Sequence, residues 1–353
     1  MNNWKKKKIM GCFFVLMILL LSFIGCGSHQ KENAQKMEYQ VGESIIKVSK
    51  PAFLYADDEK LLVADTGDNV IYEISDEKKS ITSGTVGKKD VYGFSKGGYL
   101  DGENEKAKYH SPYGITKFLE GYAISDRENH VIRYVTKEGV VTLAGNGTAG
   151  LLDGIGKESQ FHSPAGITTD KSGNLYVADS LNHCIRKIDK AGNVSLYAGG
   201  KKGYADGKRS TAKFDTPMGI YCENERLYIT DSQNQRIRMI DLKTEKVTTI
   251  AGDASYYEES TLYAGGFLDG KAEQARFDTP TGIVVKNDCI YIADTGNSAI
   301  RKIENGMVST ILQVEEESES IYPAKPIGLA IKENTLYISD SFAGLIYSIP
   351  NIQ

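Results

Sequence analysis

The chain has 353 residues, of which 41% are apolar and 25% are charged, and its formal net charge is −4 at pH 7. Because both signs of charge are mixed along it, the chain lacks the basic footprint of a nucleic-acid-binding protein, and we expect no nucleic-acid partner. Its five cysteines form no Cys-x-x-Cys pair, which argues against a zinc or redox centre.

Residues 1–25 have the pattern of an export signal. Lys5–Lys8 form a positive segment, and Ile9–Ile24 form an apolar one. Phe23-Ile24-Gly25-Cys26 resembles the lipobox of bacterial lipoproteins, although that family favours leucine where Phe23 stands. The resemblance implies a lipid anchor, palmitate included, on Cys26, and a location on the outer face of a cell membrane or envelope. The alternative is an uncleaved transmembrane anchor, since the apolar stretch is close to spanning length.

The chain then changes composition. Residues 26–41 are mostly polar and lack apolar periodicity, which predicts a flexible tether between the membrane and a domain over 42–353. At the start of that domain, Glu43–Val48 has the composition of a β-strand.

From residue 61 onward, a short apolar segment that ends in aspartate, with a polar turn and a second apolar segment after it, recurs six times. The aspartates are Asp65, Asp126, Asp179, Asp231, Asp294 and Asp340. Repeats of this length built from short strands are typical of a propeller or a repeat array.

Residues 164–198 contain the complete repeat unit. Pro164–Thr169, Leu175–Ala178, Cys184–Ile188 and Val194–Ala198 are rich in β-forming residues and are separated by turns of Gly, Asn and Asp. Four antiparallel strands in a repeated unit make the blade of a β-propeller, so we expect an all-β fold.

The sixth unit has three strands of its own. We expect Glu43–Val48 to supply its fourth strand, which closes a ring of six blades and covers an open sheet edge.

The segment from Pro164 to Ile188 resembles the NHL repeat, and the resemblance covers nearly all of the domain. It is weaker in the first and sixth units, where Tyr72 and Tyr347 stand in place of a recurring arginine. That arginine is Arg133, Arg186, Arg238 and Arg301 in the other four units. The resemblance implies a six-bladed propeller, in a family that includes protein-binding, RNA-binding and enzymatic members.

The repeated aspartates and arginines invite a functional interpretation, but a structural one fits them better. An aspartate at the end of a strand accepts N–H bonds from the following turn, and the arginine pairs with it or with a carbonyl. Four inter-blade connections also carry an Asp-Gly pair followed by an aromatic residue, which we interpret as a turn and an anchor between blades. Strand parity places these connections and the Asp turns on one face.

The residue before each Ser/Thr-Pro pair is a candidate metal ligand. Read in register, these positions should ring the channel mouth, and four consecutive ones are His110, His162, Asp215 and Asp278. Two histidines and two aspartates are a plausible ligand set for a divalent metal. The alternative is that each side chain caps the turn before the first strand.

Two connections are long and rich in tyrosine and glycine, a composition that suits adaptable binding surfaces. Their tyrosines are Tyr92, Tyr99, Tyr256, Tyr257 and Tyr263. Packing within the loops is the alternative role for them.

These features favour a binding module over an enzyme. The chain contains no Gly-x-Ser-x-Gly, no His-Glu-x-x-His and no phosphate-binding glycine loop. We expect a membrane-anchored scaffold whose loop face binds a protein, peptide or glycan. A metal-dependent enzyme of the lyase or lactonase type, with its site at the channel mouth, is the alternative, because propeller active sites are assembled from single residues on different blades.

Overall fold

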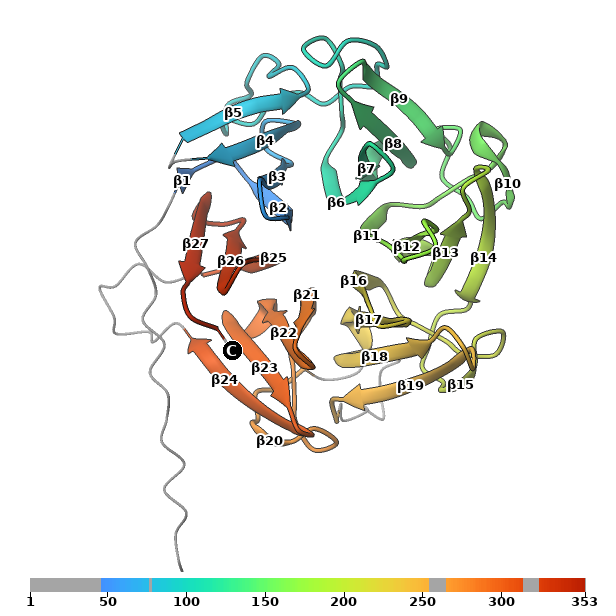
Figure 1. The fold of residues 1–353 in the computed structure, drawn as a ribbon, viewed down its shortest axis with the longest axis vertical. Coiled ribbons are helices and arrows are strands. Elements are labelled where there is room, and N and C mark those ends of the chain that lie inside the picture. Colours follow the sequence, from blue (N-terminus) through green and yellow to red (C-terminus); the bar gives the residue numbers. More distant parts are fainter. Residues whose placement is uncertain (1–45, 76–77, 254–264, 314–323, 353) are drawn as a thin grey trace, which may run out of the picture. The chain divides into compact units, whose positions relative to one another are not determined.

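Each repeat unit folds as a twisted antiparallel sheet, and six such sheets follow one another around a ring in the computed structural model (Figure 1). The structure describes residues 46–75, 78–253, 265–313 and 324–352. The prediction of an all-β propeller with six blades is confirmed.

The first three blades run from residue 51 to residue 199, each with its innermost strand first. Blade 1 comprises β2 (Pro51–Ala56), β3 (Leu61–Asp65), β4 (Val70–Ser75) and β5 (Lys78–Ser83). Blade 2 comprises β6 (Pro112–Phe118), β7 (Gly121–Asp126), β8 (Val131–Thr136) and β9 (Gly139–Ala144). Blade 3 comprises β11 (Pro164–Thr169), β12 (Leu175–Asp179), β13 (Cys184–Ile188) and β14 (Asn193–Gly199).

The remaining three blades complete the ring. Blade 4 comprises β16 (Pro217–Glu223), β17 (Arg226–Asp231), β18 (Arg236–Asp241) and β19 (Lys246–Ala251). Blade 5 comprises β21 (Pro280–Lys286), β22 (Cys289–Asp294), β23 (Ala299–Glu304) and β24 (Met307–Gln313). Blade 6 comprises β25 (Pro326–Lys332), β26 (Thr335–Asp340), β27 (Leu345–Ile349) and, from the other end of the chain, β1 (Ile46–Lys47).

The strand β1 closes the ring as expected. Ile46 pairs with Ile346, Lys47 pairs with Leu345, and Val48 N–H donates to the Gly344 carbonyl at 2.9 Å. Ile46 and Val48 are buried in a core shared by blades 6 and 1. Of the segment 43–48, residues 43–45 lie outside the described residues.

Three blades have a fifth strand that the sequence reading did not predict. The Asp-Gly connections form β10 (Gly154–Ile155), β15 (Gly207–Lys208) and β20 (Gly270–Lys271), each paired with the outer strand of the following blade. Gly102 forms a single bridge to Val140 at the same place in blade 2. These connections therefore cover outer sheet edges, which would otherwise be open to pairing with another chain.

The innermost strands approach one another so closely that each of them except β2 needs a glycine two residues after its proline. A Cβ on Gly219 would lie 2.1 Å from the Thr281 carbonyl oxygen of the next blade, and one on Gly114 would lie 2.3 Å from the Ala165 carbonyl oxygen. In β2 this position is Phe53, whose ring packs on Tyr113 at 5.0 Å between centroids.

Helical structure in the described ranges is limited to one-turn 3-10 helices. They are η1 (Arg127–Asn129), η2 (Gly156–Glu158), η3 (Ser180–Asn182), η4 (Ser232–Asn234) and η5 (Thr295–Asn297). Within those ranges no helix has the length and apolar character needed to cross a bilayer.

Candidate functional site

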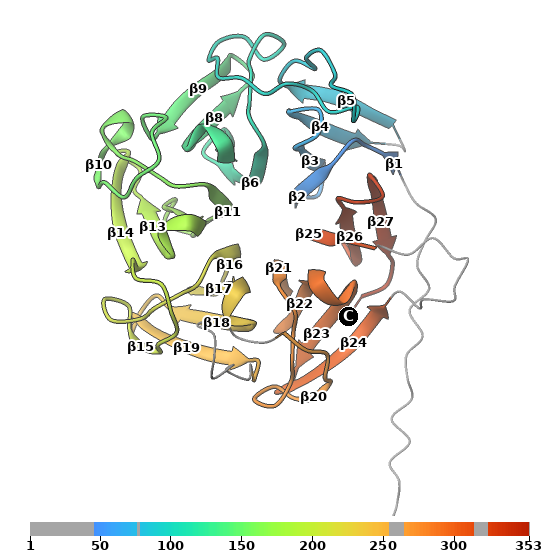
Figure 2. The same ribbon diagram turned by 180° about the vertical axis from the view of Figure 1, so that it is seen from behind.

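The turns after the repeated aspartates and the long inter-blade connections share one side of the ring, which we call the loop face (Figure 2). Ser95 N–H donates to the Gly67 carbonyl at 2.7 Å, and Asn129 Nδ2 donates to the Gly98 carbonyl at 2.8 Å. Because the sequence placed both kinds of segment on this face by strand parity, these contacts agree with that expectation.

Beneath the loop face, blades 2 to 5 each enclose one arginine. In blade 4, Arg238 Nη1 donates to Asp231 Oδ2 at 2.6 Å and Nη2 donates to Asp206 Oδ1 at 2.6 Å. The guanidinium also donates to the carbonyls of Lys213 and Ala205, and it lies 4.9 Å from the centroid of a buried phenylalanine ring, Phe214. The same arrangement holds Arg133, Arg186 and Arg301, and all four arginines are fully buried.

This cluster makes the recurring aspartates structural. Burial raises the pKa of the strand-end aspartates to about 6, against the lowering effect of the arginine and of the amide donors. They are Asp126, Asp179, Asp231 and Asp294. The second carboxylate of each cluster comes from the Asp-Gly connection, so those aspartates are arginine partners as well as turn residues.

The expected acceptor role of the strand-end aspartate is correct in blades 1 and 6 and needs correction elsewhere. Asp65 accepts from the turn amides of Gly67 and Asp68, at 2.9 and 2.8 Å. In blades 2 to 5 the carboxylate instead accepts the backbone N–H of the residue 16 or 17 positions earlier, as Asp126 does from His110 at 2.7 Å. The turn contributes an asparagine side chain in those blades.

A second set of repeated contacts joins neighbouring blades and was not foreseen from the sequence. In blades 1 to 4, the residue just before the third strand has a left-handed backbone. Its side chain accepts the backbone N–H of the Ser or Thr that directly precedes the first proline of the next blade. His130 Nδ1 accepts from Ser163 N–H at 3.2 Å, and His183 Nδ1 accepts from Thr216 N–H at 3.1 Å. Gln235 and Asn69 accept the corresponding N–H groups of Thr279 and Ser111. The sequence signal is a polar residue at the last position of the recurring turn, but its left-handed backbone could not be inferred from the residue type.

The four candidate metal ligands are distributed among separate blade contacts. The His162 ring packs on His130 with 5.6 Å between centroids, Asp215 Oδ1 lies 3.4 Å from His183 Nδ1, and Asp278 accepts a hydrogen bond from Thr279. A Cβ on Gly97 would collide with the ring of His110, so this ring lies under the connection that contains Gly97. Within the described ranges no group of three or more His, Cys, Asp or Glu residues could hold a metal ion. The metal assignment stays a prediction.

These contacts make one pH-dependent prediction. The pKa of His130 is lowered, first by burial and then by the nearby His162, while Glu128 acts in the opposite direction. The unfolded chain therefore binds a proton more readily than the folded one, so the contribution of His130 to stability is complete above pH 6.5 and declines as pH falls below that value. Replacing His130 with Asn, the residue at the equivalent position 69, should keep the acceptor and flatten the decline in thermal unfolding midpoint between pH 7 and pH 5. An unchanged pH profile would contradict this role.

The tyrosine candidates have different environments. Tyr92 is 81% exposed, in the connection between blades 1 and 2. Tyr99 is half-exposed, its hydroxyl is 2.8 Å from Thr142 Oγ1, and its ring lies 5.2 Å from the guanidinium carbon of Arg133, so it belongs to the buried arginine cluster of blade 2. Tyr256, Tyr257 and Tyr263 lie outside the described residues.

Two cavities lie at opposite ends of the innermost strands, one lined by blades 1, 2 and 6 and the other by all six blades. The one on the loop face, which we call the mouth pocket, has a volume of about 300 Å³. The residues that line it include Lys50, Ser111, Arg127, Lys325 and Ser341. His110, His162, Asp215 and Asp278 are not among its lining residues, whereas three residues that directly precede a blade's first proline are, namely Lys50, Ser111 and Lys325.

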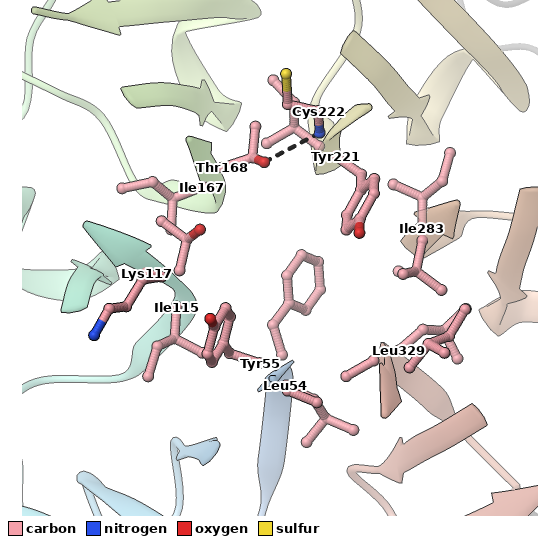
Figure 3. Close-up of a pocket in the computed structure, with 18 of the residues that line it drawn as sticks. Leu54, Tyr55, Ile115, Lys117, Ile167, Thr168, Tyr221, Cys222, Ile283 and Leu329 are labelled. Atoms are coloured by element: carbon pink, nitrogen blue, oxygen red, sulfur yellow. Dashed lines mark hydrogen bonds between the residues drawn. The ribbon is translucent and has the colours of Figure 1, made fainter. Parts of the chain in front are cut away.

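The second cavity lies at the other end of the axis, between the far ends of the innermost strands (Figure 3). It has a volume of about 260 Å³, and Ile115, Ile167 and Ile283 give it apolar walls. Tyr55 and Tyr221 also line it, and the Tyr55 hydroxyl donates to Asp57 at 3.2 Å. A cluster of apolar residues separates the two cavities. These residues are Ala52, Tyr113, Ala165, Met218 and Ile327, with Phe53 packed against them.

The three cysteines of the described ranges are free thiols. Cys184 and Cys289 are buried and Cys222 is partly buried. Burial raises the pKa of the Cys222 thiol to about 12, so none of its surroundings activates it as a nucleophile.

Comparison with known proteins shows an NHL repeat and several relatives of low sequence identity. Residues 161–188 match the model of the NHL repeat. The chain is 28% identical over 314 residues to the protein SUPPRESSOR OF QUENCHING 1 of Arabidopsis thaliana and 26% identical over 338 residues to NHL repeat-containing protein 2 of Gallus gallus. The alignments cover 67% and 83% of this chain and 29% and 43% of the relatives, so the chain spans less than half the length of either relative.

Solved structures show the same fold at low sequence identity. An auxiliary nutrient binding protein from Bacteroides thetaiotaomicron matches with a TM-score of 0.59 and 14% identity, over 86% of this chain and 69% of that one. Virginiamycin B lyase from Staphylococcus aureus matches with a TM-score of 0.55 and 15% identity, over 89% of this chain and 100% of that one. The chain is therefore a six-bladed β-propeller that contains an NHL repeat at residues 161–188 and is similar in sequence to NHL repeat-containing proteins.

Proposed function

We propose that this protein is an extracytoplasmic binding scaffold that is anchored to a membrane by its lipidated N-terminus and presents the loop face to a protein, peptide or glycan. The observation that carries the proposal is the exposure of large apolar side chains on that face. Val91 is 92% exposed, and Tyr92 and Phe342 are each 81% exposed. Exposed apolar side chains gathered around one site are a mark of interaction surfaces.

The position of these side chains supports the same conclusion. Phe342 directly follows Ser341, and Phe94 lies with its ring 5.5 Å from Lys50 Nζ. Since Ser341 and Lys50 both line the mouth pocket, the apolar side chains border its opening. A ligand that covers the opening of the mouth pocket would bury Phe342 and Phe94 at the same time. The propeller of a nutrient binding protein shows that this fold supports binding, and the lyase shows that it also supports catalysis.

The anchor has its own test. The sequence predicts lipidation at Cys26, so the wild-type protein produced in bacterial cells should incorporate labelled palmitate and Cys26→Ser should not. Absence of the label from the wild-type protein, or equal labelling of Cys26→Ser, would count against the lipid anchor on Cys26.

The scaffold role is tested by crosslinking on intact cells that produce the full chain. We expect a defined set of crosslinked ligands with the wild-type protein and with Leu119→Ser, and loss of that set with the double substitution Tyr92→Ser, Phe342→Ser. Leu119 is a matched control because it is 55% exposed and lies in the β6–β7 turn, on the other side of the ring. Equal recovery from the loop-face variant, or no recovery from any protein, would sink the proposal.

A further inference from the structure

The six contacts between neighbouring blades at the mouth are not equivalent. In blades 3, 4 and 5, the hydroxyl of the residue after the strand-end aspartate donates to the carbonyl of the next blade's first proline. Ser180 Oγ donates to Pro217 at 2.6 Å, Thr295 Oγ1 donates to Pro326 at 2.6 Å, and Ser232 makes the same bond to Pro280. These three bonds close the blade contacts on one half of the mouth.

The other half has lost this pattern. In blade 1, Thr66 Oγ1 donates to the carbonyl of Lys50 instead of a proline carbonyl. In blade 2, the residue after the strand-end aspartate is Arg127, which has no hydroxyl. The residue before the first proline also changes there. It is Ser or Thr with a left-handed backbone in blades 2 to 5, whereas blades 1 and 6 have Lys50 and Lys325 without that backbone.

All three cationic replacements line the mouth pocket. Lys50 and Arg127 lie at blade contacts where no hydroxyl bond to the proline carbonyl is found in the described ranges, and Lys325 directly precedes Pro326, the last proline that accepts one. None of Lys50, Arg127 and Lys325 forms an ion pair with another described residue, and the Nε of Arg127 is buried without a hydrogen-bond partner in the described part of the chain. Among the lining residues, Glu128 is the one acidic side chain. The pocket thus carries an excess of unpaired positive charge in a protein whose net charge is −4.

The floor of the pocket is apolar. Ala52, Tyr113 and Ile327 belong to the cluster that separates the two cavities, and the guanidinium carbon of Arg127 lies 4.9 Å from the centroid of the Tyr113 ring. A guanidinium held against an aromatic face keeps its outward N–H groups free for a planar carboxylate. A bare inorganic anion would leave the apolar floor uncovered.

We propose that the mouth pocket binds a small organic carboxylate, with its carboxylate held by Arg127, Lys50 and Lys325 and its apolar body on Tyr113 and Ile327. A volume of about 300 Å³ is at the lower limit of pockets that bind small molecules. This inference goes beyond the scaffold role and stands whether or not the loop face binds a macromolecule.

The test uses the full chain in detergent micelles and three probes, namely benzoate, its neutral analogue benzamide and inorganic phosphate, each titrated by calorimetry. We expect saturable benzoate binding that weakens as salt is added, and affinities for benzamide and phosphate that are lower by about ten-fold or more, since a hydrogen bond to a charged group contributes about 1.5–3 kcal/mol. Equal affinity for benzoate and benzamide, equal affinity for benzoate and phosphate, or no saturable benzoate binding would each overturn the proposal.

The variants restore residues that the repeat itself uses at these positions, so they are expected to fold. Arg127→Ser should lower the affinity for benzoate by about ten-fold or more, and Lys50→Ser and Lys325→Thr by smaller factors. Lys243→Ser is the control, because Lys243 is an exposed lysine in the β18–β19 turn on the other side of the ring. Thermal unfolding checks that each variant is folded. Wild-type benzoate affinity in the folded Arg127→Ser, Lys50→Ser, Lys325→Thr triple variant would overturn the assignment of the site.

Discussion

Replacing Arg238 with Met lowers the free energy of unfolding by about 3–5 kcal/mol, the usual effect of removing one partner of a buried ion pair. Asp231 would stay fully buried without its cation, and Asp206 and two carbonyl oxygens would lose their donors. The methionine side chain keeps the contact with Phe214, so the loss reports on charge and hydrogen bonds more than on packing. Urea unfolding followed by circular dichroism measures it.

The effect of Arg238→Met should depend on pH in a defined direction. Burial already raises the pKa of Asp231 to about 6, above the value near 3.8 that it has when unfolded, and loss of the arginine raises it further. A carboxyl whose pKa is raised by folding stabilises the folded state below its unfolded pKa, and that contribution is lost as pH rises through the folded value. The free energy of unfolding of the variant should therefore be closest to that of the wild type near pH 5 and furthest from it at pH 8.

Two further variants separate charge from structure. Adding Asp231→Asn to Arg238→Met removes the unpaired charge, and we expect it to recover part of the loss, because the two residues interact directly and their effects are not additive. Lys243→Ala removes an exposed pair with Glu225 and should leave the unfolding midpoint unchanged. A loss from Arg238→Met no larger than that from Lys243→Ala would show that the buried cluster is not a main source of stability.

The repeat allowed the blades, their order and the ring closure to be predicted, because strands, turns and the pairing of neighbouring units follow from local residue patterns. The pairing of Arg238 with Asp231 followed from the same alignment, since both residues recur at fixed places in four units. The partners supplied by the Asp-Gly connections were missed, because a residue some 30 positions away along the chain approaches the arginine only after the blade has formed.

The candidate site was predicted less well, for a reason that lies in the backbone. Ser111, Ser163, Thr216 and Thr279 have φ between 47° and 56°, which is uncommon for residues other than glycine and cannot be inferred from their side chains. His110, which directly precedes Ser111, has its ring against Gly97 of an inter-blade connection. Lys50 and Lys325 were not predicted as site residues. The repeat pattern is defined by the residues that its copies share, whereas the mouth pocket depends on positions at which the copies differ.

Removing β1 is expected to open the ring and destabilise the propeller by roughly 5 kcal/mol. Ile46 and Val48 are 8% and 4% exposed, and burial of such side chains contributes about 1.5–3 kcal/mol each. The paired residues Ile346 and Leu345 would lose their β1 partners, so β27 would become an exposed sheet edge. Since each blade packs on its neighbours alone, loss of closure affects blades 6 and 1 first and leaves the buried arginine clusters of blades 2 to 5 intact.

The comparison that isolates this effect uses two shortened chains, one that begins at residue 42 and one that begins at residue 49. We expect the first to unfold at the temperature of the unshortened domain and the second to unfold roughly 10 °C lower, since 1 kcal/mol corresponds to about 2–4 °C in a domain of 150–250 residues and less in a larger one. Hydrogen exchange should show faster exchange confined to blades 6 and 1 in the second chain. Ile46→Asn in the longer chain replaces one buried apolar side chain while the backbone pairing remains. The unfolding temperature of this variant should therefore fall between those of the two shortened chains. Equal midpoints for the two chains would mean that blade contacts at the inner strands, where Gly328 meets Ala52, hold the ring closed without the outer strand.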